Sequence, residues 1–139
     1  MTTSNGTLRR VVYVSHSLPD DLDMSATLAS ILDAARRNNA RVGVTGALLY
    51  SGRRFAQVLE GPPDAVEAIF ETIQCDARHD NIAVLKVTSP PHRAFANWSM
   101  AFVETPEVHP AELDVTADAE HIVGVLQAAI HNTEAAAAA

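Results

Sequence analysis

The sequence is poor in cysteine and contains no long apolar run. Cys75 is the single cysteine among 139 residues, so an intrachain disulfide and a cysteine-rich zinc site are excluded. We expect Cys75 to lie partly buried near the end of a helix. No stretch approaches the roughly 18 consecutive apolar residues of a membrane-spanning helix, and the polar start of the chain does not resemble a signal peptide. We therefore expect a cytoplasmic protein with no membrane partner.

Basic residues, paired histidines and glycine-rich motifs are also scarce. Ten Lys and Arg stand against seventeen Asp and Glu, which gives a formal net charge of -7 and disfavours nucleic acid as a partner. The six histidines form no His-x-x-x-His pair, so no metal site is predicted. A Gly-x-Gly-x-x-Gly motif is missing, which excludes a Rossmann dinucleotide site.

The chain does contain enough apolar residues for one packed domain. Hydrophobic residues make up 47% of the chain and charged residues 19%, a balance that favours a folded core over disorder. Apolar stripes at helical spacing predict one helix from about Met24 to Asn38 and a second that starts at Gly61-Pro62-Pro63-Asp64. Alternating apolar residues predict strands at about residues 9–15, 42–50, 54–60, 82–88 and 98–103.

The order of these elements, βαββαββ, predicts an α+β domain. Its first six elements match the ferredoxin-like pattern, in which two helices pack on one face of a mixed sheet. We assign residues 1–104 to this domain and residues 105–139 to a C-terminal helical extension. Thr116 is expected to cap the last helix, which should cover the other sheet face and act as an output element. Its apolar side carries Ile122, Val125, Leu126, Ala129 and Ile130.

Three polar residues do not fit an ordinary core. Strand alternation places Gln57 between Phe55 and Leu59 on the third strand, where an unpaired buried amide costs about 1–3 kcal/mol. Tyr13 lies on the first strand, which this topology places beside the third, and Asn39 lies at the end of the first helix. A Tyr–Gln hydrogen bond would satisfy both groups without a ligand. Converging amides also suit a planar heterocycle with alternating carbonyls and ring nitrogens, such as a flavin.

Six segments of the chain, taken in order, resemble the BLUF family of blue-light sensors that use FAD. A single match of this kind would be weak, but six in the right order with compatible spacing are specific, and they run from about residue 9 to 104. The segments are Val12-Tyr13-Val14-Ser15; Ile31-Leu32 with Ala34-Ala35-Arg36-Arg37-Asn38-Asn39; Val44-Thr45-Gly46-Ala47-Leu48-Leu49-Tyr50; Phe55-Ala56-Gln57-Val58-Leu59-Glu60-Gly61; Asp76-Ala77-Arg78-His79; and Phe95-Ala96-Asn97-Trp98-Ser99-Met100.

The resemblance implies roles for individual residues. Tyr13 would be the photochemical electron donor, and Gln57 would be the switching amide between Tyr13 and the flavin. The residues implied in binding FAD are Tyr13, Asn38, Asn39, Gln57, Arg78 and His79. Those implied in relaying the switch are Ser15, Trp98 and Met100. FMN stays open as an alternative to FAD.

The resemblance also implies a function. The protein would be a blue-light photoreceptor without enzyme activity, in which light drives electron and proton transfer from Tyr13 and rearranges the hydrogen bonds of Gln57. Because only 35 residues follow residue 104, the output is expected to pass to an effector protein in trans. We also expect the photoreceptor to be a homo-oligomer.

Two other functions are compatible with some of the same residues. An acylphosphatase-like hydrolase would use Arg36, Arg37 and Asn39 on a phosphate substrate, although the glycine loop that cradles phosphate is missing after the first strand. A ferredoxin-like regulatory module without a cofactor is the other alternative. In that case Arg78 and His79 would simply place cations at the end of a helix.

Structural roles are also open for residues near the proposed site. Trp98, Met100 and Phe102 share a face of the fifth predicted strand and would pack as ordinary core. Strand parity places Glu60 on the face opposite Gln57, which favours a structural role for this acidic residue over a catalytic one.

Overall fold

A computed structural model describes residues 7–17, 24–75, 79–104, 113–114 and 117–138, with the side chains of 17, 24–25, 79–81 and 131–138 left out. Five strands and three helices make up this part of the chain. In chain order they are β1 (Arg9–Ser17), α1 (Met24–Val42), β2 (Thr45–Ser51), β3 (Arg54–Gly61), α2 (Pro63–Gln74), β4 (His79–Thr88), β5 (Ala101–Glu104) and α3 (Ala119–Ala138). No helix in these ranges is both long and apolar enough to cross a membrane.

The strands form one mixed sheet in the order β4-β1-β3-β2-β5. β1 pairs antiparallel with both β3 and β4, and β2 pairs antiparallel with β3. β5 alone runs parallel to its neighbour, β2. The predicted ferredoxin-like α+β fold is therefore confirmed.

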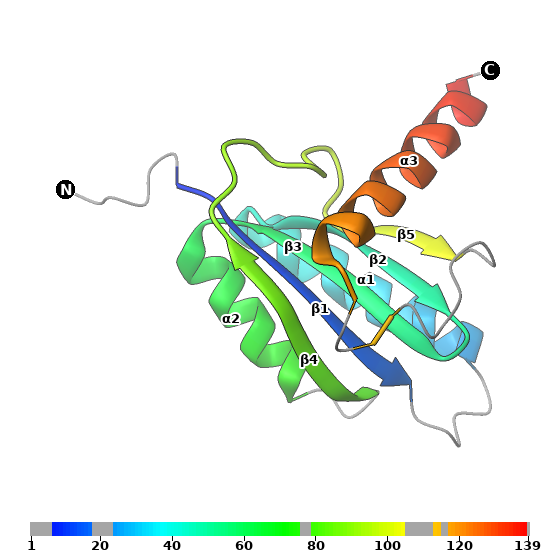
Figure 1. Cartoon of the computed structure of the whole chain (residues 1–139), viewed down its shortest axis with the longest axis horizontal. Helices are drawn as coiled ribbons and strands as arrows, with labels where there is room; N and C mark the ends of the chain where they lie inside the picture. Colours follow the sequence, from blue (N-terminus) through cyan, green and yellow to red (C-terminus); the bar gives the residue numbers. More distant parts are fainter. Residues whose placement is uncertain (1–6, 18–23, 76–78, 105–112, 115–116, 139) are drawn as a thin grey trace.

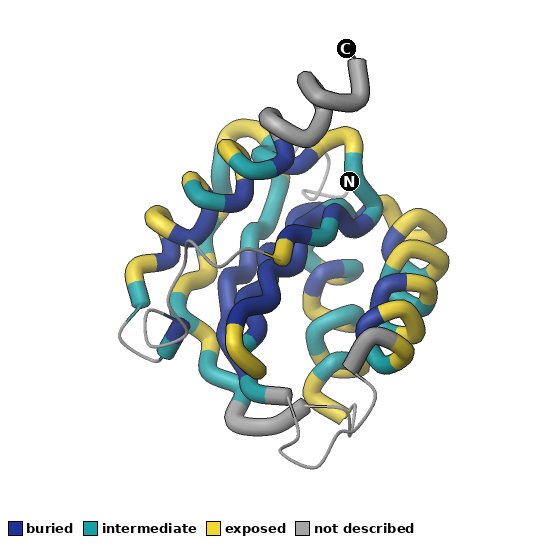
Figure 2. The backbone as a smooth tube through the Cα atoms, turned by 90° about the vertical axis from the view of Figure 1, so that its right-hand side faces the viewer, coloured by how far each residue is buried: buried dark blue, intermediate teal, exposed yellow. Residues whose placement is uncertain are grey.

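The helices cover both faces of the sheet (Figures 1 and 2). α1 and α2 pack on one face, and the apolar stripes predicted for both helices join the buried cluster there. α3 packs on the other face, where its buried side chains meet those of β1, β2, β3 and β5. The expectation that the last helix covers the second face is confirmed by this packing.

Strand alternation divides the central residues between the two faces as predicted. Val11 and Tyr13 of β1 lie in the cluster beneath α1 and α2, whereas Val12 and Val14 lie in the cluster beneath α3. On β3, Phe55 and Leu59 share the face of α1 and α2, and Ala56 and Val58 take the opposite one. Parity alone therefore identifies which side chains of these two strands face the same helices.

Four element boundaries differ from the prediction by three or four residues. β2 begins at Thr45 and not at residue 42, and β4 begins at His79 and not at residue 82. The other two differences, in α1 and β5, bear on the site. α1 continues past Asn38 to Val42, because no helix breaker precedes Gly43, whose φ of 74° is a left-handed conformation that glycine adopts without strain. β5 begins at Ala101 and not at Trp98. The segment before β5 is held by a turn in which the backbone N–H of Trp98 donates to the carbonyl of Phe95, and a turn prevents pairing of that segment as a strand.

The late start of β5 overturns the expected strand face of Trp98, Met100 and Phe102. Trp98 packs against the cluster beneath α3, whereas Met100 is fully buried in the cluster beneath α1 and α2. Residues two apart share a face only within an extended strand, and Trp98 and Met100 precede the strand.

The start of α3 and the residue after α2 also differ from the expectation. Thr116 lies outside the described residues, and the start of α3 is capped by Asp118, whose Oδ1 accepts the backbone N–H of Glu120 at 2.9 Å. Cys75 follows the last residue of α2 and is exposed, not partly buried.

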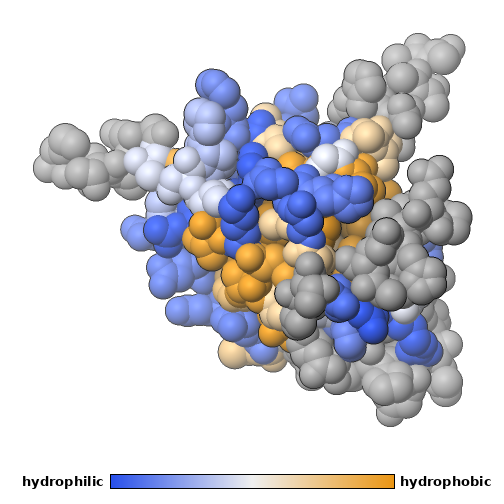
Figure 3. All heavy atoms as spheres, in the orientation of Figure 1, coloured by the Kyte–Doolittle hydropathy of each residue, from blue (hydrophilic) through white to orange (hydrophobic). Residues whose placement is uncertain are grey.

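One edge of the sheet carries apolar side chains on the surface. β4 is that edge, and Val84 and Val87 on it are 46% and 55% exposed. Figure 3 shows apolar side chains gathered near the middle of the face on which β4 lies. An edge strand offers backbone groups for pairing with another chain, so this is the surface on which self-association is easiest to envisage.

Glu60 is a fully buried carboxylate that ties the loop before β5 to the centre of the sheet. Its Oε2 lies 2.7 Å from Nε of Arg10 on the neighbouring strand β1. Its oxygens also accept the backbone N–H groups of Ala94 and Phe95 at 2.9–3.0 Å. Charge-assisted bonds to several donors compensate the cost of burying this charge, which supports the expected structural role.

Replacement of Glu60 by Gln should therefore destabilise the fold. The substitution leaves the Arg10 guanidinium without its counter-ion, which we expect to lower the free energy of unfolding by about 3 kcal/mol. Lys86→Gln breaks an exposed ion pair with Glu120 and should change the same quantity by less than about 1 kcal/mol. Urea denaturation of both variants, followed by circular dichroism, measures the difference. An equal decrease in the free energy of unfolding in both variants would show that the buried pair of Arg10 and Glu60 stabilises the fold no more than an exposed ion pair.

Candidate functional site

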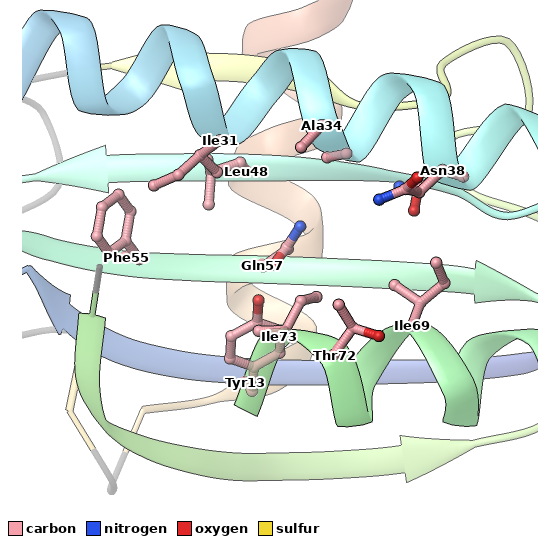
Figure 4. A pocket seen from close by; sticks show the side chains of 12 residues that line it. Tyr13, Ile31, Ala34, Asn38, Leu48, Phe55, Gln57, Ile69, Thr72 and Ile73 are labelled. Atoms are coloured by element: carbon pink, nitrogen blue, oxygen red, sulfur yellow. The ribbon is translucent and has the colours of Figure 1, made fainter. Parts of the chain in front are cut away.

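A pocket opens between α1 and α2 above the face of the sheet that they cover (Figure 4). Its empty volume is about 680 Å³, including space open to solvent. Most of its lining is apolar, with a few polar side chains among it. The lining residues are Tyr13, Ile31, Ala34, Ala35, Asn38, Asn39, Leu48, Phe55, Gln57, Ile69, Thr72 and Ile73.

Tyr13 and Gln57 face each other across the two central strands of the sheet. They are register partners in the β1–β3 ladder, and their exposed fractions are 2% and 5%. In Figure 4 the hydroxyl of Tyr13 points toward Gln57, and the amide nitrogen of Gln57 points toward α1. The ring of Phe70 on α2 packs against Tyr13 with centroids 5.2 Å apart and fixes the phenol from the other side.

The amide of Gln57 is held by a weak hydrogen bond. Its Nε2 donates to Sδ of Met100 at 3.5 Å, and a thioether sulfur is a weak acceptor. A stronger acceptor or donor that enters the pocket would therefore displace this contact at little cost.

Asn39 presents a buried acceptor that the described residues do not satisfy. The residue is 1% exposed, and its Nδ2 donates to the carbonyl of Ser99 at 2.8 Å. Its Oδ1 is buried and has no hydrogen-bond partner in the part of the chain that the structure describes. An unsatisfied buried acceptor costs about 1–3 kcal/mol, so this oxygen is suited to a ligand that brings an N–H donor into the pocket.

Of the remaining predicted site residues, only some line the pocket. Asn38 lines the pocket, and Ser15 is fully buried on β1 opposite Phe55 without lining it. Arg78 lies outside the described residues. His79 is the first residue of β4, and its side chain is not described.

Two of the predicted relay residues lie on opposite sides of the sheet. Met100 reaches the pocket side through its sulfur, whereas Trp98 is half-buried on the side of α3. The segment that carries both therefore projects side chains to both faces of the sheet just before β5.

Sequence reasoning missed the apolar walls of the pocket. Ile31 and Ala35 entered the sequence analysis only as members of a matching segment, and Ile69, Thr72 and Ile73 were not assigned to the site. The two adjacent small residues Ala34 and Ala35 on the inner side of α1 were the available signal, because small side chains there leave room between the helices.

Comparison with known proteins identifies the family of this site. Residues 8–101 match the family model described as "BLUF: Sensors of blue-light using FAD". The chain belongs to the BLUF family of flavin-binding blue-light sensors, so the resemblance noted in the sequence is confirmed.

Relatives and solved structures agree with this assignment. The chain is 32% identical over 111 residues to the photoactivated adenylate cyclase subunit alpha of Euglena gracilis, a match that covers 78% of this chain and 11% of that protein. It is 37% identical over 93 residues to the blue light- and temperature-regulated antirepressor BluF of Escherichia coli (strain K12), covering 67% and 23%. The chain thus spans only a small part of the length of these curated relatives.

Among solved structures, the photo-activated state of BlsA superposes on this chain with a TM-score of 0.78 and 29% sequence identity. The match covers 88% of this chain and 94% of that one. The fold is therefore shared over most of both chains.

The residues of the pocket fit the flavin that the family uses. Apolar side chains from α1, α2 and the sheet form walls that a flat ring requires. Asn39 offers an unsatisfied acceptor oxygen at one side, and Gln57 a weakly held amide at the centre. These groups complement the N–H and carbonyl groups along the edge of an isoalloxazine ring.

Asn39→Ala should weaken the binding of FAD about tenfold, because it removes a hydrogen bond between Oδ1 and the ligand. Titration of flavin-free protein with FAD, followed by flavin fluorescence, measures this affinity. The stability of the flavin-free variant should change little, since the unsatisfied oxygen is lost together with the bond to Ser99. Gln127→Ala, an exposed substitution on α3, is the control. An affinity equal to that of the control would refute the role of Asn39.

Proposed function

We propose that this protein is a blue-light photoreceptor in which Tyr13 and Gln57 form the photochemical pair. The observation that carries the proposal is the direct cross-strand pairing of these two residues beneath the pocket, both nearly inaccessible to solvent. A bound flavin supplies the absorption of blue light and an acceptor for an electron. The proposed role of the protein is signalling and not enzyme catalysis.

Tyr13 releases an electron and the proton on its hydroxyl oxygen, and it recovers both when the cycle ends, so there is no net oxidation. Gln57 lies directly beside that hydroxyl and changes its hydrogen bonds, by rotation or tautomerisation of the amide. Phe70 covers Tyr13 from α2, and a flavin that fills the pocket would displace water from the space between α1 and α2. A dry site strengthens each hydrogen bond in it.

The energy of this exchange is sufficient for a switch. Replacing one or two buried hydrogen bonds by others is worth on the order of 1–3 kcal/mol. Such a difference shifts a two-state equilibrium about tenfold or more. The weak contact between Gln57 Nε2 and Met100 Sδ favours this exchange, because its loss opposes the rearrangement only slightly.

We propose that the signal leaves the pocket through Met100 and the segment before β5. Met100 contacts Gln57 on one side of the sheet, and Trp98 two residues earlier packs on the side of α3. A displacement of this segment would therefore reach the helix that covers the opposite face. Ser15, Trp98 and Met100 are proposed relay residues, and residues 105–139 are proposed as an output extension of the domain 1–104.

The finer assignments of cofactor and partners are also proposals. We propose FAD as the cofactor, with FMN as the alternative. An effector protein in trans and a homo-oligomer are proposed partners, and β4 with its exposed valines is a surface suited to self-association. A cytoplasmic location stays a prediction.

The acylphosphatase-like alternative is disfavoured by contacts within the structure. Its two central residues, Arg36 and Asn39, both donate to backbone carbonyls of the segment before β5. One donor of each side chain is thus committed to the fold, which leaves fewer of them for a phosphate group. The family assignment also disfavours a module without a cofactor.

Tyr13→Phe and Gln57→Leu should each retain flavin but abolish the light-induced red shift of its absorption. Tyr13→Phe removes the hydroxyl proton and makes the side chain harder to oxidise. Gln57→Leu removes the amide that rearranges. Tyr50→Phe is a matched control, since Tyr50 is the only other tyrosine and is buried in the same cluster. Absorption spectra before and after blue illumination measure the shift. A normal photocycle in Gln57→Leu would refute the proposal.

A further inference from the structure

Met100 is the residue whose position decides what Gln57 contacts, yet the sheet does not hold it. Its side chain is fully buried with its sulfur 3.5 Å from Gln57 Nε2. The β2–β5 ladder begins only at the next residue, where Ala101 pairs with Ala47. The placement of Met100 therefore depends on contacts outside the ladder.

Side chains of α1 provide these contacts. Nε of Arg36 donates to the carbonyl of Met100 at 3.0 Å, and Nδ2 of Asn39 donates to the carbonyl of Ser99 at 2.8 Å. Arg36 and Asn39 lie three residues apart and thus on one side of the helix. Two consecutive carbonyls before β5 are in this way bound to the same helix that lines the pocket.

The other anchors of this segment lie further from Met100. Glu60 holds the backbone N–H groups of Ala94 and Phe95, and the N–H of Gly46 donates to the carbonyl of Trp98 at 3.0 Å. Gly46 is required there, because a Cβ would collide with the backbone oxygen of Val58. Within the described residues, Arg36 binds the carbonyl of Met100 itself, and Asn39 binds the carbonyl of the peptide that precedes it.

We infer that Arg36 is a positioning residue that latches the backbone of Met100 and so keeps its sulfur against Gln57. An arginine donor forms a charge-assisted hydrogen bond, which is stronger than a bond between neutral groups. The bond is made while Met100 lies at Gln57. We assign this arrangement to the dark state, so that the bond stabilises the dark state selectively and sets how long the light-shifted arrangement lasts. This second consequence rests on the proposed function.

The neighbouring residue Arg37 provides a control that separates the loss of this hydrogen bond from a general effect of lost charge. Arg37 is exposed on the same turn of α1, so Arg37→Ala removes the same charge with the same change in helix propensity. Arg36→Ala alone removes the donor to Met100. Arg36→Lys keeps the charge and a donor and should restore part of the effect.

The first experiment follows the position of Met100 directly in the dark. The chain contains three methionines, Met1, Met24 and Met100, so the methyl signals of protein labelled with 13C-methyl methionine can be assigned with Met100→Leu. The Met100 signal should shift or split in Arg36→Ala and remain unchanged in Arg37→Ala. An unchanged signal in Arg36→Ala would overturn the latch, whether or not the protein responds to light.

The second experiment measures the decay of the light-shifted absorption after illumination. Loss of the latch makes the dark arrangement less stable, so we expect the shifted state of Arg36→Ala to last about three- to tenfold longer than in Arg37→Ala. In a Met100→Leu background, which lacks the sulfur, the same substitution should have no effect on the lifetime. Equal lifetimes of the two arginine variants, or the same lengthening without the sulfur, would overturn the role in the photocycle. Wild-type protein without a red shift would refute the proposed function, while the methyl signals still decide the latch.

Discussion

The antiparallel pairing of β1 with β3 is the interaction on which the site depends. This register places the Tyr13 phenol opposite the Gln57 amide at the centre of a five-stranded sheet. Because strand side chains alternate, a slip of one residue would send one of the two to the face beneath α3 and separate them. The proposed photochemical pair is thus positioned by the same ladder that holds the fold together.

The third strand serves both faces of the sheet at once. Gln57 points into the pocket between the helices, while Glu60 on the same strand points the other way and binds the loop that leads to Met100. The loop returns to the pocket side, where Asn39 and Arg36 bind its last carbonyls. Two residues of β3 thus contact the two ends of this loop: Glu60 binds its beginning, and Gln57 contacts Met100 at its end.

Local periodicity explains how much of this arrangement could be predicted. Alternation on β1 and β3 placed Tyr13 beside Gln57, and helical stripes identified the faces that cover the sheet. The start of β5 was predicted three residues early, because Trp98 and Met100 alternate like strand residues although a turn and side-chain bonds determine their positions. The contact from Arg36 to Met100 joins residues 64 positions apart, and no pattern within a window of the sequence reports such a distance. The walls of the pocket were likewise hidden within stripes that any packed helix shows.

The short length of β5 has a consequence for local stability. A strand of four residues at the edge of a sheet, paired on one side only, has few hydrogen bonds to break before it detaches. Such segments open sub-globally at a free energy well below that of complete unfolding, and their amide protons exchange with solvent accordingly. We therefore expect β5 to open at a lower free energy than β1 and β3, and Met100 joins this strand to Gln57.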